Sequence, residues 1–322
     1  MQRRNIWALG ASLCAAPAVL RAQPAWPSRP VRVLVGFPPG QSSDISARLL
    51  AAEMEKTLGQ PFVIENRPGA GATLAAAEAA RGPTDGYTVL FTSTGPLAIA
   101  PHLYQRLGYD ALTDFAPSTM VAKAPLILVV GASSPFRSVA DLVAAGQGSR
   151  SLNYGSGGTG ATAHLGTELF RMASGTNLTH VPYRGSSPAL NDLVAGRIDF
   201  MFDSPAPLLP LIRDGQIRAL ASTGPEPYSE LPEVPLIAAT YPGFDVHSWT
   251  CFVFRAGTPE PIVERFHRAM TPIIGTPEMT ERMIRTGVEP YLGLDPAAIK
   301  QLMATEFAKW QQVIRTANIR LE

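Results

Sequence analysis

The chain has 322 residues, of which 46% are hydrophobic and 16% charged, and its formal net charge is +1. A chain of this length can bury the cores of two ordinary domains. The near-neutral charge and the lack of any Lys/Arg block argue against a nucleic-acid partner, and no uncharged run is long enough to cross a membrane.

The N-terminus is typical of an export signal rather than of a folded element. Arg3 and Arg4 precede an apolar run over residues 6–20, and the small residue Ala22 stands at a plausible cleavage point. We therefore expect residues 1–22 to be removed on export to the periplasm. Both the twin-arginine and the general secretory route fit this layout.

Removal of this segment changes both charge and cysteine content. The segment holds three arginines and no acidic residue, so the formal net charge falls to about −2. Cys14 leaves with it and Cys251 stands alone, so we expect no disulfide even in an oxidising compartment.

Short apolar, β-branched runs alternate with helical stretches after residue 30. In the first set, strands are predicted at 31–37, 62–65 and 88–92, and helices at 43–58 and 71–80. Residues 96–117, rich in Pro, Tyr and Asp, are expected to form a loop. In the second set, strands are predicted at 126–130, 152–154, 178–182, 198–202 and 218–221, with helices at 138–145, 161–173, 188–195 and 206–214.

This alternation predicts an α/β fold with parallel sheets and helices on both faces. The C-terminal part differs, because one strand at 249–255 is followed only by helices, at 259–274, 278–286 and 296–317. Thr258-Pro259 and Asp295-Pro296 are each a cap residue followed by proline, which is typical of helix starts.

A lone strand with terminal helices cannot form a domain, so we expect this tail to fold back on the first set. Residues 23–124 and 251–322 would then form lobe 1, and residues 125–250 lobe 2. The chain crosses between the lobes near residues 123–125 and again near 249–252, and two crossing strands are what a hinge requires.

Two loops each join a strand to a helix, one in either lobe. They read Phe37-Pro-Pro-Gly-Gln-Ser-Ser-Asp44 and Asn153-Tyr-Gly-Ser-Gly-Gly-Thr-Gly160. Free backbone N–H groups and the positive end of the helix dipole favour an anion at such helix starts, and ligands of open α/β sheets bind beyond the carboxyl ends of the strands. The alternative is that both are ordinary tight turns with N-caps at Ser42 or Ser43.

Two enzyme-like interpretations have weaker support. Gly155, Gly157 and Gly160 match a dinucleotide motif, but no acidic residue follows in the stretch 178–184, so no cofactor is expected. Ser156 lies on a sharp turn without the G-x-S-x-G pattern of hydrolases. The five histidines are scattered without metal-ligand spacing, so no metal site or catalytic residue is expected.

The roles of three charged residues stay open. Asp44 either caps helix N–H groups or reaches the ligand. Arg67 and Arg184 either clamp a carboxylate or lie in surface turns.

The chain resembles the receptor component of tripartite tricarboxylate transporters, the Bug proteins, over nearly all of its length after the export signal. The resemblance rests on an ordered series of short motifs: Trp26–Pro30, Phe37–Asp44, Glu65–Gly71, Pro83–Tyr87, His102–Tyr104, Asp114-Phe115, Asn153-Tyr154, His164-Leu165, His180–Gly185, Gly196–Asp199, Ala219–Ala221, Leu231–Pro235 and Lys309-Trp310.

The resemblance implies a two-lobed type II periplasmic binding protein that captures a small carboxylate and catalyses no reaction. We expect a monomer that passes its ligand to membrane transport subunits or to a signalling partner. The alternative is a secreted α/β hydrolase-like enzyme with an unidentified nucleophile. The resemblance also places Thr92–Thr94 and Asp203 on the floor of the cleft. The expected ligand-binding residues are Phe37, Pro39, Gly40, Gln41, Ser42, Ser43, Asp44, Thr92, Ser93, Thr94, Ser156, Gly157, Gly158, Thr159, Thr162 and Asp203.

Several positions depart from the family pattern. Gln41 replaces a usual glycine, Ala100 and Ser204 replace asparagine, Ala161 replaces a hydroxyl residue and Cys251 replaces glycine. The Gln41 amide either points to solvent or reaches across the cleft and selects a ligand with a second polar group.

Overall fold

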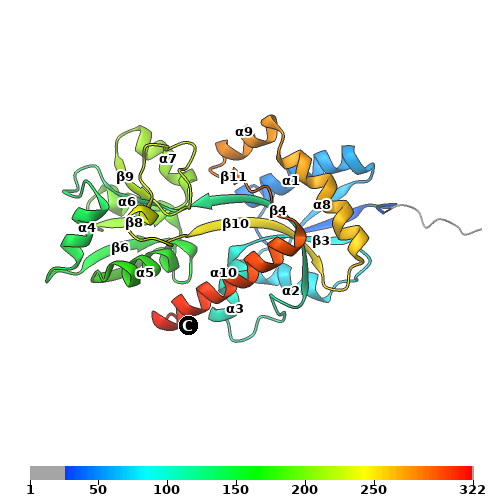
Figure 1. Cartoon of the computed structure of the whole chain (residues 1–322), viewed down its shortest axis with the longest axis horizontal. Helices are drawn as coiled ribbons and strands as arrows, with labels where there is room; N and C mark the ends of the chain where they lie inside the picture. The colour runs from blue at the N-terminus through cyan, green and yellow to red at the C-terminus, as the bar shows by residue number, and fades with distance from the viewer. Residues whose placement is uncertain (1–25, 321–322) are drawn as a thin grey trace, which may run out of the picture.

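The structure is a computed structural model that describes residues 26–320. The predicted export signal at residues 1–22 lies outside the described residues. Two separate β-sheets, each covered by helices, form the two halves of an elongated molecule (Figure 1).

The first sheet has six strands in the order β11-β4-β10-β3-β1-β2. Its strands are β1 (Val31–Val35), β2 (Phe62–Asn66), β3 (Thr88–Ser93), β4 (Phe115–Pro125), β10 (His247–Arg255) and β11 (Glu289–Pro290). The second sheet has five strands in the order β7-β6-β8-β5-β9. Its strands are β5 (Ile127–Gly131), β6 (Leu152–Ser156), β7 (Leu178–Pro182), β8 (Phe200–Asp203) and β9 (Ile217–Ser222).

Helices cover both sheets. Around the first sheet lie α1 (Ser42–Leu58), η1 (Ala70–Ala72), α2 (Thr73–Arg81), η2 (Gly95–Ile99), α3 (Ala100–Leu103), α8 (Glu260–Ile274), α9 (Pro277–Arg285) and α10 (Pro296–Thr316). Around the second lie α4 (Val139–Gly146), α5 (Thr162–Ser174), α6 (Ser186–Val194), α7 (Pro205–Arg213) and η3 (Ile237–Ala239).

Both sheets are mixed, so the prediction of parallel sheets was wrong in part. The strands β1, β2 and β3 are parallel, but β10 runs antiparallel to β3 and β4. In the second sheet β5 runs antiparallel to β8 and β9. The reason is the connection between the sheets. β1, β3 and β6 end at the space between the two halves, whereas β5 and β10, the strands with which the chain enters a half after each crossing, begin there.

The two connections between the halves lie side by side. β4 runs directly toward β5, and β10 pairs with β4 along its whole length, from His247 opposite Pro125 to Arg255 opposite Phe115. Figure 1 shows these two long strands passing through the middle of the molecule. The register shifts twice within the pair, between Thr250 and Cys251 and between Phe252 and Val253.

The helix pattern explains how α1 covers its sheet. Its buried side chains recur at i, i+3, i+4 and i+7, which forms one apolar stripe: Ala47, Leu50, Ala51 and Met54. The start of α2 lies still closer to the sheet. A Cβ atom on Gly36 would stand 2.3 Å from Cβ of Ala72, so this position requires glycine.

The C-terminal helices return to the first sheet. α8 packs on β4 and α1, and α10 packs on β4 and η2 and also touches α5 of the other half. Asp295 caps α10 through a 2.7 Å bond to the N–H of Ala298, as predicted. At α8 the N-cap is Pro259 rather than Thr258, whose hydroxyl bonds Arg255 instead.

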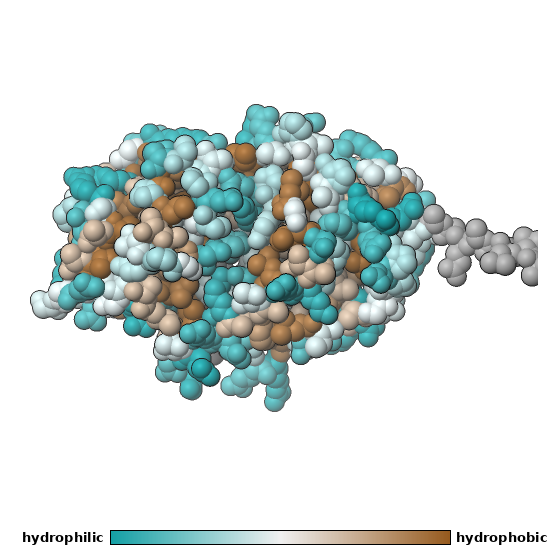
Figure 2. Space-filling model, in the orientation of Figure 1, coloured by the Kyte–Doolittle hydropathy of each residue, from teal (hydrophilic) through white to brown (hydrophobic). Residues whose placement is uncertain are grey.

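The segment predicted as a loop over residues 96–117 differs most from the prediction. It contains η2 and α3, and β4 begins within it at Phe115. On the face shown in Figure 2, hydrophobic residues lie in small separate groups among hydrophilic ones. Within residues 26–320 no helix combines the length and the hydropathy that a membrane span needs.

Candidate functional site

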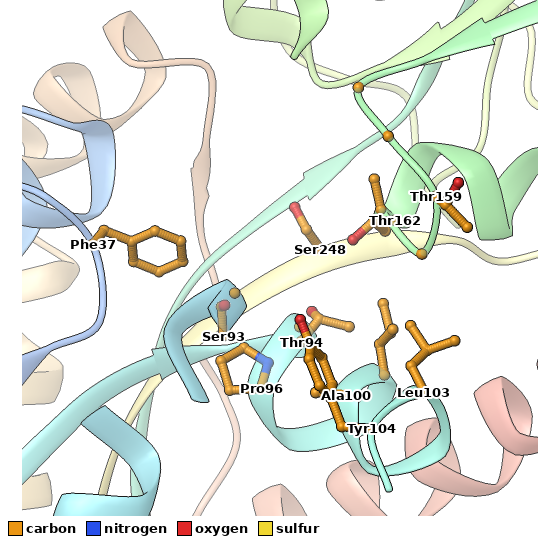
Figure 3. Close-up of a pocket in the computed structure, with 17 residues that line it drawn as sticks. Phe37, Ser93, Thr94, Pro96, Ala100, Leu103, Tyr104, Thr159, Thr162 and Ser248 are labelled. Atoms are coloured by element: carbon orange, nitrogen blue, oxygen red, sulfur yellow. The ribbon is translucent and has the colours of Figure 1, made fainter. Parts of the chain in front are cut away.

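A cavity of about 430 Å³ lies between the two halves. It opens where β1, β3 and β6 end, which is the edge of an α/β sheet where ligands bind. Residues from both sheets line it (Figure 3): Phe37, Gly71, Ser93, Thr94, Gly95, Pro96, Ile99, Ala100, Leu103, Tyr104, Gly157, Gly158, Thr159, Gly160, Ala161, Thr162 and Ser248.

One wall of the cavity is the loop from Gly157 to Thr162. Gly158 and Gly160 have φ angles of 136° and 80°, which only glycine adopts without strain. The loop leads into α5, whose N-cap residue Ala161 has no side chain able to cap the helix. The first N–H groups of α5 therefore lack a side-chain acceptor at the cavity, where they favour an anion.

Two histidines support this loop through hydrogen bonds on the side away from the cavity. Nε2 of His180 lies 2.7 Å from Oγ of Ser156, and the same hydroxyl accepts from the N–H of Gly158 at 3.2 Å. The N–H of Gly160 donates to Nδ1 of His164 at 3.0 Å. Ser156 is fully buried, so its hydroxyl supports the loop and does not face the cavity.

The opposite wall comes from η2 and α3 of the first half. Pro96, Ile99, Ala100 and Leu103 line the cavity there. They lie on one continuous helical stretch, the π-helix η2 followed by α3, and together they form an apolar stripe along the cavity. Figure 3 shows Ala100, Leu103 and Tyr104 across the space from Thr159 and Thr162.

The cavity is connected to the strand β10 through Thr94. The hydroxyl of Thr94 accepts from the N–H of Trp249 at 2.8 Å. Ser248, the preceding residue of β10, lines the cavity itself. A ligand at this site therefore lies against one of the two strands that join the halves.

The loop from Phe37 to Asp44 lies at the edge of the cavity. Gln41, not Ser42 or Ser43, is the N-cap of α1, and its side chain makes no capping bond. Asp44 is 2% exposed and accepts from the N–H of Gly40 at 2.8 Å. Arg48 and Asn66 also bond it. Burial alone would raise the pKa of Asp44, but these hydrogen bonds hold it below its usual value.

The structure brings part of the predicted site together. Seven predicted residues line the cavity: Phe37, Ser93, Thr94, Gly157, Gly158, Thr159 and Thr162. Nine others lie outside its lining: Pro39, Gly40, Gln41, Ser42, Ser43, Asp44, Thr92, Ser156 and Asp203. The sequence interpretation missed the stripe from Pro96 to Leu103, although its helical spacing was a usable signal. Ala100 and Ala161, two of the departures from the family pattern, both line the cavity.

Asp203 has an unusual environment at the end of β8. It is 7% exposed, and its Oδ1 accepts from the N–H of Ser204 at 2.7 Å. Within the described part of the chain its Oδ2 has no hydrogen-bond partner. Burial raises the pKa of this carboxyl above its usual value.

The two candidate arginines lie away from the cavity lining. Arg67 is paired with Glu65 at 3.1 Å and with Glu78 at 3.0 Å. Arg184 is exposed. In the described residues no Lys, Arg, His, Asp or Glu side chain lines the cavity, and no three His, Cys, Asp or Glu side chains are grouped to hold a metal ion.

Comparisons with known proteins agree with this geometry. A model of the family described as "Tripartite tricarboxylate transporter family receptor" matches residues 46–319. Protein BugT of Bordetella pertussis (strain Tohama I) is 33% identical over 304 residues, covering 92% of each chain.

Two solved structures are also similar over most of the chain. One is described as R. palustris Rpa4515 with adipate. It shows 38% identity and a TM-score of 0.77, with 92% of this chain and 100% of that chain covered. The other is MatC from Rhodopseudomonas palustris with bound malate. It shows 32% identity and a TM-score of 0.72, with 90% of this chain and 100% of that chain covered.

Proposed function

This chain belongs to the tripartite tricarboxylate transporter receptor family, and on that basis we propose that it captures a small carboxylate between two lobes in the periplasm. The two-lobed fold predicted from the sequence is confirmed, because the chain forms two separate sheets covered by helices and both similar structures, with TM-scores of 0.77 and 0.72, match at least 90% of it. The proposed lobe 1 comprises residues 23–124 and 251–322, and the proposed lobe 2 comprises residues 125–250.

One observation carries the proposal. The cavity between the sheets has on one side a glycine-rich loop that leads into the uncapped N-terminus of α5. Backbone N–H groups at such a position bind an anion without a cationic side chain. The hydroxyl groups of Thr159 and Thr162 add two further donors there. A carboxylate is an anion that this arrangement accepts.

The similar structures support the class of ligand. Their descriptions name adipate and malate, two small carboxylates, as the molecules bound to those proteins. For this chain we propose a carboxylate ligand that contacts Ser93, Thr94 and the loop from Gly157 to Thr162. Rotation about β4 and β10 would bring the loop from Gly40 to Ser43, at the uncapped start of α1, onto the same ligand.

The remaining parts of the proposal follow from the family. The protein would be exported by the twin-arginine or the general secretory route and act as a monomer. It would deliver its ligand to membrane transport subunits or present it to a signalling partner.

One contact favours a second candidate, a secreted hydrolase. Oγ of Ser156 lies 2.7 Å from Nε2 of His180, which is the distance of a nucleophile and its base. However, Ser156 is fully buried, and its hydroxyl also bonds the backbone of Gly158 at 3.1 Å. Hydrolysis of p-nitrophenyl acetate that is abolished in Ser156→Ala would support the hydrolase.

Thermal unfolding of the mature protein with a panel of carboxylates tests binding. A ligand at a hundred times its Kd stabilises the folded state by about 2.7 kcal/mol. Thr162→Ala should weaken the response, while Thr305→Ala, an exposed threonine of α10, should leave it unchanged. A panel of mono-, di- and tricarboxylates that shifts no transition would reject the proposed function.

A further inference from the structure

The two walls of the cavity differ in chemistry. The wall from Gly157 to Thr162 offers backbone N–H groups and the hydroxyls of Thr159 and Thr162. The facing wall offers the carbon surfaces of Pro96, Ile99, Ala100 and Leu103, flanked by the hydroxyl-bearing residues Ser93, Thr94 and Tyr104. A ligand that lies between the two walls therefore meets backbone N–H groups and hydroxyls at the loop, and a mainly apolar surface where it lies on Pro96, Ala100 and Leu103 (Figure 3).

The apolar wall is a continuous surface. Its four side chains lie along one unbroken helical stretch, in which the π-helix η2 passes directly into α3, and all four line the cavity. The intervening Leu97 and Ala98, 2% and 1% exposed, belong to the core and do not line the cavity. Ile99 and Ala100 are also largely covered, at 3% and 5% exposed, and the part of the face that stays uncovered borders the cavity, where it meets the ligand.

A second charged group on the ligand would lack a partner on this wall. Among the residues that the structure describes, no Lys, Arg or His lines the cavity. An ionised group brought against a carbon surface loses hydration without gaining a counter-ion. The uncapped helix start in the lining is that of α5, and the other polar lining residues, Ser93, Thr94, Tyr104 and Ser248, add hydroxyl groups but no positive charge.

From these observations we infer that the ligand is a monocarboxylate with an apolar alkyl or aryl body. Its carboxylate lies at the loop from Gly157 to Thr162, and its body lies on the stripe of Pro96, Ile99, Ala100 and Leu103. This inference rests on the proposed function and specifies the class of carboxylate. Leu103 lies near the outer end of the stripe. Together with Ala100 it then discriminates between ligands by the polarity of the end of the ligand that lies farthest from its carboxylate.

A matched pair of acids tests the inference. Hexanoate and adipate share a six-carbon chain and differ by one carboxylate, and benzoate supplies an aryl body of similar size. We expect hexanoate and benzoate to bind the mature protein at least tenfold more tightly than adipate in isothermal titration.

Variants test whether the apolar stripe causes the preference for hexanoate over adipate. Leu103→Gln should reduce the ratio of hexanoate to adipate affinity by about tenfold, since it places a polar group on the stripe. Leu74→Gln is the matched control, because Leu74 is 55% exposed and lies outside the cavity lining. It should leave the ratio unchanged.

The outcomes separate the two proposals. If adipate binds as tightly as hexanoate or more tightly, the inference is wrong while carboxylate capture stands. An unchanged ratio in Leu103→Gln would also overturn it, because the wall would then not contact the body of the ligand. If neither these acids nor the wider carboxylate panel binds, the proposed function fails and the inference with it.

Discussion

The imidazole rings of His164 and His180 lie stacked face to face, with centroids 3.9 Å apart and planes only 7° from parallel. Two positive rings would repel at this distance. Burial lowers the pKa of His164, and burial together with His164 lowers the pKa of His180 to about 4. Nδ1 of His164 accepts from the N–H of Gly160, so that nitrogen carries no proton. The loop at the cavity therefore rests on two neutral rings.

Acid should destabilise the protein through this pair. A histidine in the unfolded chain has a pKa of about 6.5, so the unfolded state takes up protons before the folded state does. Stability is fully present above about pH 6.5 and falls as the pH drops toward 4. We expect a loss of up to about 2 kcal/mol between pH 7.5 and pH 5 in urea denaturation. His180→Gln should reduce this loss, whereas His267→Gln, in the other half, should retain it.

The buried carboxyl of Asp203 should oppose folding at neutral pH. Burial raises its pKa, so its ionised form is less favourable in the folded than in the unfolded state, and stability falls as the pH rises through this window. Asp203→Asn removes the charge and keeps the shape. We expect it to raise the free energy of unfolding by about 1 kcal/mol at pH 7.5 and by less at pH 4. A lower melting temperature at pH 7.5 would show that Oδ2 has a partner the structure lacks.

Ser156→Ala should weaken ligand binding without contact to the ligand. Its hydroxyl joins His180 to the backbone of Gly158, and its removal loosens the loop that lines the cavity. We expect a loss of about 0.5–1.5 kcal/mol, roughly two- to tenfold in Kd. Ser187→Ala, an exposed serine of the same half, is the control for titration calorimetry. An unchanged Kd in Ser156→Ala would mean that the loop holds its shape alone.

Arg67→Ala should leave binding unchanged. Its guanidinium already bonds Glu65 and Glu78, and its side chain is 47% exposed. Exposed ion pairs contribute little, so we expect the free energy of unfolding to fall by less than about 1 kcal/mol. Loss of carboxylate binding in this variant would restore the arginine-clamp interpretation left open by the sequence.

Gln41 offers a way to stabilise α1. It is the N-cap of that helix, is exposed, and makes no side-chain capping bond. Gln41→Ser should add about 0.5–1 kcal/mol to the free energy of unfolding in urea denaturation. Gln41→Gly should keep the ratios of affinity among carboxylates, because glycine retains the backbone N–H that rotation of the lobes would bring to the ligand and the exposed Gln41 amide lies outside the cavity lining. A changed ratio would support the hypothesis that this side chain selects the ligand.

The elements that could be predicted from sequence are those with a local signal. The strand β7 was predicted at its observed bounds, and the glycine-rich loop before α5 was correctly placed at the cavity. The directions of β5 and β10 were missed, because they depend on where the chain crosses between the sheets. The apolar stripe from Pro96 to Leu103 was predicted as a loop because it contains Pro96 and Pro101 and is followed by a stretch with further Pro, Tyr and Asp residues.

Asp44 illustrates a different limit. Its sequence position fits both a cap and a ligand contact. Only the positions of Arg48 and Asn66 show that the carboxylate oxygens of Asp44 already accept hydrogen bonds from these two side chains. Arg48 is one turn further along the same helix, but Asn66 comes from a separate strand. Contacts of that second kind depend on tertiary packing, which no local pattern encodes.

Trp249, whose backbone N–H donates to Thr94, is an intrinsic fluorescent reporter of changes near the cavity. The indole of Trp249 is 1% exposed, and within the described chain its Nε1 has no acceptor. It therefore fluoresces from a dry, apolar setting, one peptide unit from a residue that lines the cavity. Trp26 packs on Tyr87 and Trp310 donates to Glu306, so both have fixed surroundings. A bending of β10 would thus change the emission of one of the three tryptophans that follow the predicted export signal, with no dye attached.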